Sequence, residues 1–526
     1  MRAKLFLSLF LTTSLAFSQS YQLDTSFGTD GKTVTEFDPN FDAITSIILY
    51  PDGKILGSVN LDYSIDGTTN IVRFNVDGSY DSTFGTNGVV ITSIINEVDY
   101  GHTIALQSDG KIVVSGSRSI NNNATNFNFA VARYNSDGTP DTTFGLTGLV
   151  QTDFNNNFDN GRAVAIQADG KIILAGETQM SNADKQHFGV VRYNTDGSID
   201  TSFGINGLVT AYFPVFGNSF SYPVCVRVMP DDKILIGGGN ITDYLGPLYD
   251  TDTAFLKLNS DGTPDVTFGT DGLMISGSPV YEAIYTFEMT ANNKIIAAGY
   301  SLMGEGIAAL VQKFDAAGNP DSGFGTDGLV QILAHENITK DNITNISITP
   351  EGKIKTTGSS YNGSNYDVTL MQLNADGTLD NTFDADGIFT FDFANSDEYG
   401  NNAFGLPDGK VIFCGATNSG SSFNSFIARF LPENLAVVNV TFNNIGVYPS
   451  PFTDFISIDF MLPDPQYITI DLFDVSGKNS INLIKGKLFG SGFNSQKLPV
   501  PTNLSNGIYF LTISDGKNTK VLKITK

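Results

Sequence analysis

Apolar and polar residues alternate in short runs along most of the chain. In one region the run Ala163–Ile166 precedes a turn at Asp169-Gly170, and the run Ile172–Gly176 follows that turn. Alternation with a period of two is typical of strands with one buried face, and Asp-Gly is a frequent turn between paired strands. The pattern therefore predicts a β-hairpin, and further runs such as Phe188–Asn194 predict additional strands.

The predicted hairpin belongs to a sequence repeat. An Asp-x-x-Phe-Gly-x-x-Gly element recurs at spacings of 56 to 65 residues, with its aromatic residue at Phe27, Phe84, Phe144, Phe203, Phe268, Phe324 and Phe383. Each hairpin turn is followed by a lysine, at Lys54, Lys111, Lys171, Lys233, Lys294, Lys353 and Lys410. Four short strands in each of seven copies, with no helical periodicity between them, predict an all-β fold, a seven-bladed β-propeller over residues 19–431.

The two ends of the repeat region predict how the ring closes. If the strand before each hairpin is innermost, the chain begins with an outermost strand, Lys32–Phe37, and the last copy ends with a third strand, Ser425–Phe430. We therefore expect these two segments to pair, because an open ring would leave strand edges exposed.

These markers resemble the family of delta-60 repeats, and the strand order is similar to that of NHL-type propellers. The resemblance covers roughly residues 20–431 and implies a propeller fold. It implies no particular activity, because one propeller fold carries many unrelated functions.

The N-terminus has the features of a secretory signal peptide, predicted over residues 1–18. Arg2 and Lys4 precede an apolar run, Leu5–Phe17, and small residues precede Gln19. The apolar run is shorter than the roughly 20 residues that a spanning helix needs, so the sequence predicts no transmembrane segment.

The last eighty residues differ from the rest of the chain. After a predicted linker at residues 432–445, alternating runs such as Ile456–Phe460 and Ile508–Ile513 predict a small immunoglobulin-like β-sandwich over residues 446–526. These residues carry eight Lys and six Asp, whereas the whole chain has a net charge of −25. The charge therefore changes sign at this boundary.

This segment resembles the type A C-terminal sorting domain of the type IX secretion system of Bacteroidetes. The matching stretches are Val447–Phe452, Leu472–Lys478, Gly507–Leu511 and Lys520–Lys526, with Ser450 where the family usually has Asn. The resemblance implies recognition by the secretion machinery, export across the outer membrane, removal of the domain, and attachment of the propeller to the cell surface or its release.

Composition excludes several classes of function. A net charge of −25 disfavours nucleic acid as a partner. Two cysteines in 526 residues provide no disulfide framework, and no Cys/His cluster has the spacing of a zinc site. The three histidines lie in different repeats, so the sequence indicates no catalytic residue and no metal ligand.

The recurring residues predict structural roles. The Asp that opens each Phe-Gly element occurs in every copy, which favours a turn or cap, and the Phe favours a wedge packed between blades. A calcium loop at Asn135–Asp141 is the alternative for the turn, but the expected bidentate Glu is missing and one copy has Ala317 in place of Asp. We therefore predict no cofactor, with calcium as the one alternative.

Positions at which the copies differ are better candidates for binding. Nine residues before each hairpin lysine the copies carry Thr45, His102, Arg162, Val224, Tyr285, Thr344 and Asn401. His102, Arg162 and Tyr285 predict a ligand site at the channel mouth, and variable rim decoration is the alternative. Six residues before the lysine, Arg227 and Glu288 are expected to pair across adjacent blades.

The sequence thus favours a secreted or cell-surface binding or adhesion module over an enzyme, with an extracellular glycan or protein as ligand. The alternative is a hydrolase or lyase acting on a polysaccharide, which needs carboxylates beside His102 and Arg162 at one mouth. A purely structural surface-layer role is the third reading.

Overall fold

The computed structural model describes residues 20–433 and 445–526, apart from 38–40, 62–68, 93–98, 121–122, 182–184, 214–219, 243–249, 278–280, 305, 336–339, 394–395, 407, 419, 421, 463–465, 475–479, 491 and 515–518. The predicted signal peptide and most of the predicted linker lie outside these residues. One compact unit is Tyr21–Pro432, and a second unit includes Glu433–Lys526. Within the described part of the chain, no helix has the length and apolar character needed to cross a membrane.

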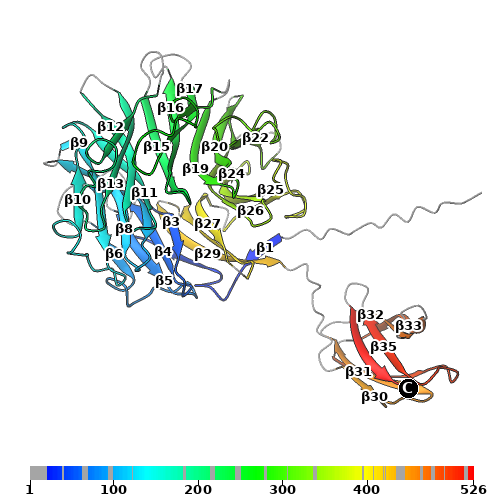
Figure 1. The fold of residues 1–526 in the computed structure, drawn as a ribbon. Helices are drawn as coiled ribbons and strands as arrows, with labels where there is room; N and C mark the ends of the chain where they lie inside the picture. The colour runs from blue at the N-terminus through cyan, green and yellow to red at the C-terminus, as the bar shows by residue number, and fades with distance from the viewer. Residues whose placement is uncertain are drawn as a thin grey trace, which may run out of the picture. The chain divides into compact units, whose positions relative to one another are not determined.

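The unit Tyr21–Pro432 is built from antiparallel sheets, which confirms the all-β propeller fold (Figure 1). Seven sheets are described in it, and we number them by their order in the chain. Sheet 1 contains β3 (Asp42–Leu49), β4 (Ile55–Leu61), β5 (Thr69–Phe74) and β6 (Val89–Ile91). Sheet 2 contains β7 (Asp99–Leu106), β8 (Ile112–Ile120), β9 (Asn123–Tyr134) and β10 (Leu149–Thr152). Sheet 3 contains β11 (Asp159–Ile166), β12 (Ile172–Gln179), β13 (Gln186–Tyr193) and β14 (Leu208–Ala211).

The remaining sheets of this unit follow the same order. Sheet 4 contains β15 (Phe220–Val228), β16 (Ile234–Thr242), β17 (Asp250–Leu258) and β18 (Leu273–Ile275). Sheet 5 contains β19 (Glu282–Met289), β20 (Ile295–Met303), β21 (Gly306–Phe314) and β22 (Leu329–Ile332). Sheet 6 contains β23 (Asp341–Ile348), β24 (Ile354–Tyr361), β25 (Tyr366–Leu373) and β26 (Ile388–Phe391). Sheet 7 contains β27 (Glu398–Gly405), β28 (Val411–Asn418), β29 (Phe423–Glu433), β1 (Ser20–Leu23) and β2 (Lys32–Thr35).

The first strand of each sheet lies innermost. Consecutive first strands contact one another around the ring, from β3 through β7, β11, β15, β19 and β23 to β27, and β27 in turn contacts β3. The predicted hairpin therefore joins the innermost strand to the second strand in every sheet, and the recurring lysine lies just after that turn.

The ring is closed by the N-terminal residues. Strand β2 pairs with β29 in a register that places Lys32 opposite Ala428 and Thr35 opposite Ser425. The predicted closure is therefore confirmed, and residues from both ends of the repeat region share sheet 7.

The second unit contains two sheets. A three-stranded sheet holds β30 (Gly446–Tyr448), β31 (Phe455–Leu462) and β34 (Gly492–Pro499), and a four-stranded sheet holds β33 (Ser480–Phe489), β32 (Gln466–Asp474), β35 (Ile508–Ser514) and β36 (Thr519–Thr525). Buried residues of both sheets form one core, including Ile456, Phe460, Ile470, Leu511 and Ile513. This packing confirms the predicted β-sandwich.

Candidate functional site

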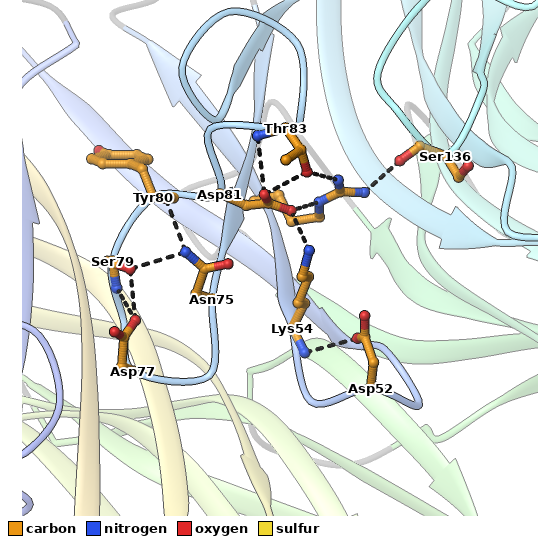
Figure 2. Close-up of polar contacts among 10 residues, drawn as sticks. Asp52, Lys54, Asn75, Asp77, Ser79, Tyr80, Asp81, Thr83 and Ser136 are labelled. Carbon is orange, nitrogen blue, oxygen red and sulfur yellow. Dashed lines mark hydrogen bonds and ion pairs between the residues drawn. The ribbon is translucent and has the colours of Figure 1, made fainter.

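The recurring Asp of the Phe-Gly element is the centre of a repeated clasp. In sheet 1, the Asp81 carboxylate accepts hydrogen bonds from Arg73 Nε at 2.7 Å and from Lys54 Nζ at 2.8 Å, and Thr83 N donates to it at 3.1 Å (Figure 2). Lys54 is the lysine that follows the hairpin turn, so the two sequence markers of the repeat contact each other. This arrangement explains why both recur together.

The clasp keeps its carboxylates ionised. Burial by itself would raise the pKa of Asp200, the equivalent residue in sheet 3, but hydrogen bonds from Ser202 and Lys171 and the charge of Arg192 lower it to about 2. The pKa of Asp81 is also held well below its usual range. Carboxylates locked in this way stabilise the fold and are poor general acids.

The clasp also joins neighbouring sheets. The guanidinium of Arg192 in sheet 3 donates to the carbonyl of Ser260 in the following sheet at 2.5 Å, and Arg429 in sheet 7 donates to Val76 O in sheet 1 at 2.6 Å. Each of these Arg side chains also lies over the recurring Phe, with Arg192 4.6 Å from the Phe203 ring centre. The recurring Phe side chains are fully or almost fully buried, which confirms their predicted role in packing.

The alternative calcium loop is occupied by its own hydrogen bonds. The Asp137 carboxylate accepts from Thr139 N at 2.9 Å and from Thr139 Oγ1 at 2.7 Å, and Asn135 Nδ2 donates to Thr139 Oγ1 at 3.0 Å. These are the bonds of an Asx turn. The oxygen side chains in this segment therefore serve the turn itself.

The candidate binding positions share an unexpected backbone feature. In each of the seven innermost strands the ladder to the second strand is interrupted, and the residue nine before the hairpin lysine lies at that interruption: Thr45, His102, Arg162, Val224, Tyr285, Thr344 and Asn401. A β-bulge leaves a residue unpaired and re-aims its side chain. These positions form a bulge ring in the middle of the innermost strands, rather than at their ends.

Small polar side chains in the bulge ring bind the next sheet. Thr344 Oγ1 in sheet 6 donates to Gly400 O in sheet 7 at 2.6 Å, and Asn401 Nδ2 in sheet 7 donates to Ile44 O in sheet 1 at 3.1 Å. The innermost strand of sheet 7 approaches the second strand of sheet 6 closely here, because a Cβ at Gly400 would lie 2.6 Å from Gly358 O on β24. At Thr344 and Asn401 the side chain therefore has a structural role, since it joins neighbouring sheets.

Arg162 and Tyr285 make different contacts. Arg162, with its side chain 35% exposed, pairs with the buried Glu177 at 2.6 Å. Tyr285 is 45% exposed and packs against Tyr300 at 5.7 Å between ring centres, and Tyr300 stacks on Tyr281 at 5.9 Å. Burial raises the pKa of Tyr285, so its hydroxyl stays protonated.

The three predicted site residues are thus distributed over sheets 2, 3 and 5. Arg162 and Tyr285 each contact residues of their own sheet, and His102 lies in the bulge of β7 with its side chain outside the described residues. The predicted pair of Arg227 and Glu288 is confirmed, with Nε and Oε1 2.8 Å apart.

A row of aromatic rings near the start of the innermost strands was not predicted from the sequence. It runs across sheets 6, 7 and 1 with successive ring centres 5.1 to 5.7 Å apart, through Tyr361, Tyr366, Tyr399, Phe423 and Phe41. One feature of the sequence could have indicated aromatic rings here. The position eleven residues before the hairpin lysine is a tyrosine in three copies, namely Tyr100, Tyr222 and Tyr399.

Acidic residues begin most of the innermost strands, and this signal was also missed. Asp42 accepts a hydrogen bond from Phe37 N at 2.9 Å, and Asp159 accepts one from Phe154 N at 2.8 Å, so each carboxylate holds the segment that leads into its strand. Burial raises the pKa of Asp159 to about 6 and that of Asp341 to about 7. These residues form an inner acidic ring with a structural role.

One group of carboxylates has the geometry to hold a cation. Oxygens of Asp367, Asp392 and Glu398 lie within 4.8 Å of one another, the one such cluster of three or more metal-ligating side chains in the described part of the chain. Asn362 Nδ2 and Asn365 Nδ2 donate to Asp367 at 3.0 and 3.2 Å. Hydrogen bonds thus already stabilise part of this cluster.

Two cavities in the described part of the propeller lie beside outermost strands. A groove of about 780 Å³ is lined by Gln312, Leu329 and Gln331 of sheet 5 and by Thr378 of sheet 6, and another of about 610 Å³ is lined by Val89 and Ile91 of sheet 1 with Pro140 of sheet 2. Both run beside the outermost strand of a sheet, away from the bulge ring.

Comparison with known proteins agrees with this architecture. The family model described as domain of unknown function (DUF5122) beta-propeller matches residues 51–84, 107–144, 167–203, 230–268 and 349–383, and the secretion system C-terminal sorting domain matches residues 446–526. A search of curated proteins finds no match.

Several solved structures are similar in fold. The polysaccharide lyase Uly1 is 12% identical over 79% of this chain and 94% of the other, with a TM-score of 0.43. The α-L-arabinofuranosidase Arb93A from Fusarium graminearum is 13% identical over 80% and 98%, with a TM-score of 0.36. A chain from the complex of Drosophila Plexin A with Semaphorin 1b is 9% identical over 81% and 89%, with a TM-score of 0.37.

A sorting domain of this kind implies interaction with the secretion machinery and indicates export to the cell surface or secretion. The chain is therefore a β-propeller repeat protein that carries a type IX secretion C-terminal sorting domain.

Proposed function

We propose that the exported propeller is a binding module for an extracellular glycan, and that the ligand binds where Tyr285 is exposed on the innermost strand of sheet 5. The observation that supports this most directly is the position of Tyr285. Tyr285 is 45% exposed on a bulged strand, whereas its equivalents Thr344 and Asn401 make hydrogen bonds between sheets.

Neighbouring rings make Tyr285 a rigid anchor. Tyr300 packs against it, and Tyr281 stacks on Tyr300 with the two hydroxyls 3.5 Å apart. Tyrosine offers a flat apolar face and a hydroxyl at low cost in conformational entropy, which suits a ligand with both apolar faces and hydroxyl groups. Sugar rings have this combination.

Charge supports a neutral glycan over an anionic one. The chain carries a net charge of −25, and the Arg162 guanidinium is paired with Glu177 at 2.6 Å. A paired guanidinium still donates hydrogen bonds to hydroxyl groups, but it attracts an acidic sugar only weakly.

The contacts of the clasp carboxylates and of two carboxylates at the start of innermost strands favour binding over catalysis. Asp42 and Asp159 accept backbone hydrogen bonds at the start of their strands, and the clasp residues Asp81 and Asp200 are held by lysine and arginine. A glycosidase needs two carboxylates that face the substrate, one of them able to donate a proton.

The test is a glycan array probed with the full chain, followed by titration of each hit. We expect Tyr285→Ala to weaken binding of a neutral polysaccharide by about tenfold or more, the loss typical of a central aromatic anchor. The matched control is Tyr212→Ala, since Tyr212 is 51% exposed and lies directly after β14, the outermost strand of sheet 3.

Two results would contradict the proposal. Equal loss of binding in the Tyr212 and Tyr285 variants would show that Tyr285 is no specific anchor. Shortening of a polysaccharide by the purified wild-type chain, abolished by substitution of a carboxylate, would establish the hydrolase or lyase alternative.

A further inference from the structure

The four-stranded sheet of the sorting domain has one face in the core and one face outside it. Alternate residues of β32 and β35, such as Leu472, Tyr509 and Leu511, belong to the buried core. Because side chains alternate along a strand, Phe473 and Phe510 point to the opposite side of the sheet. This side is the outward face of the sorting domain.

Apolar residues gather at one part of the outward face. Phe473 lies directly opposite Phe510 in the strand register, and Ile508 is two residues from Phe510 on the same face. Val521 on the neighbouring strand lies opposite Thr512, which places it diagonally beside Phe510, and it is 55% exposed. We call Phe473, Ile508, Phe510 and Val521 the outer apolar patch.

The outer apolar patch has a polar border with charges of both signs. Lys523 is exposed and lies opposite Phe510 in the register of β35 and β36, and Asp471 is two residues from Phe473 on the same face of β32. An apolar centre with a polar rim is the usual composition of a protein interface. Exposed apolar patches on small domains mark interaction sites.

We propose that the outer apolar patch is the surface through which the sorting domain docks on a protein of the secretion machinery. The partner is a protein because the domain matches a secretion system sorting domain, whose role is to be recognised during export. Phe510 lies at the centre of the patch, between Phe473 on one strand and Lys523 on the other. It is therefore the predicted anchor.

The test measures export of the full chain in a host with a type IX secretion system. We expect Phe510→Ser and Val521→Glu each to reduce the fraction that reaches the surface or medium by about tenfold or more, with accumulation in the periplasm. Val521→Glu changes an exposed side chain, so it remains informative if Phe510→Ser fails to fold. Melting of each purified variant reports folding.

The matched control is Phe493→Ser, because Phe493 is 67% exposed and lies on β34 of the other sheet. We expect this variant to be exported like the wild type. Wild-type export of a folded Val521→Glu variant, or equal loss of export for Phe493→Ser, would overturn the proposal. Binding of the purified chain to anionic vesicles, lost in Val521→Glu, would assign the patch to a lipid surface and overturn it too.

Discussion

The clasp and the bulge ring of the propeller are both repeated in every sheet, but they tolerate sequence change very differently. The clasp is almost uniform, since its carboxylate is Asp in all seven copies and its partners are in most copies the hairpin lysine and an arginine. The seven positions of the bulge ring are occupied by six different residue types. Uniform positions thus hold the sheets together, whereas variable positions are free to acquire specificity.

The largest expected effect comes from breaking the clasp. Asp81→Ala would leave the buried Arg73 without its carboxylate, and losing one partner of a buried ion pair costs about 3 kcal/mol of unfolding free energy. Sheet 6 supplies the comparison, because Gln372 replaces the arginine beside Asp380. Asp380 still pairs with the partly exposed Lys353, so Asp380→Ala should also destabilise the fold, but by about 1 to 2 kcal/mol less than Asp81→Ala because no buried guanidinium loses its partner.

Denaturant unfolding of the two variants measures this difference. A cost for Asp380→Ala equal to that for Asp81→Ala would show that the buried guanidinium is not what makes the clasp stabilising.

The bulge ring should separate binding from stability. Tyr285→Ala is expected to weaken glycan binding by about tenfold, equivalent to about 1.4 kcal/mol, while it changes the unfolding free energy by less than about 1 kcal/mol because the ring is half exposed. Isothermal titration and thermal melting of the same samples provide the two values. A large loss of stability with unchanged affinity would make Tyr285 a packing residue.

A structural member of the bulge ring should behave in the opposite way. Thr344→Ala removes the hydroxyl that donates to Gly400 O at 2.6 Å, which should cost about 1 kcal/mol of unfolding free energy and leave glycan binding unchanged. Thr344→Ser keeps the hydroxyl and should restore most of the stability. If Thr344→Ser is as unstable as Thr344→Ala, the methyl group rather than the hydrogen bond is responsible.

The inner acidic ring predicts a dependence of stability on pH. Burial raises the pKa of Asp341 from 3.8 to about 7, so the folded state retains a proton that the unfolded chain has lost. The contribution of Asp341 to the free energy of unfolding is complete below about pH 4 and is lost as the pH rises to about 7. Asp341→Asn should therefore flatten the decrease of melting temperature between pH 4 and 7.

At lower pH the clasp predicts the opposite dependence of stability on pH. Asp200 has a pKa lowered to about 2, so its contribution is present above about pH 4 and is lost as the pH falls towards 2. A melting temperature of Asp341→Asn that follows the wild type at every pH would contradict the assignment to Asp341.

Much of the fold could be predicted from the sequence because the repeat markers make local contacts. Asp81 and Lys54 are both recurring residues, and each lies at a turn whose type is set by nearby Gly and Asp residues. The closure of the ring by β2 followed from the same counting of strands. Periodicity therefore determined the elements and their order.

The candidate site was less predictable, because bulges depend on how neighbouring strands approach. The residue nine before the hairpin lysine is a candidate because it varies between the copies, but its position in a bulge follows from the close approach of neighbouring sheets, such as that of Gly400 to Gly358. The backing of Tyr285 by Tyr300 joins residues on different strands. Such pairs are set by strand register, which a single sequence does not specify.

The most direct test of the account is a crystal structure of the protein with an oligosaccharide derived from its best array hit. We predict a sugar ring stacked on Tyr285, with hydroxyl groups within hydrogen-bond distance of the neighbouring innermost strands. A sugar bound in the groove beside β22, or at the clasp, would contradict the claim that the variable bulge ring is the binding surface.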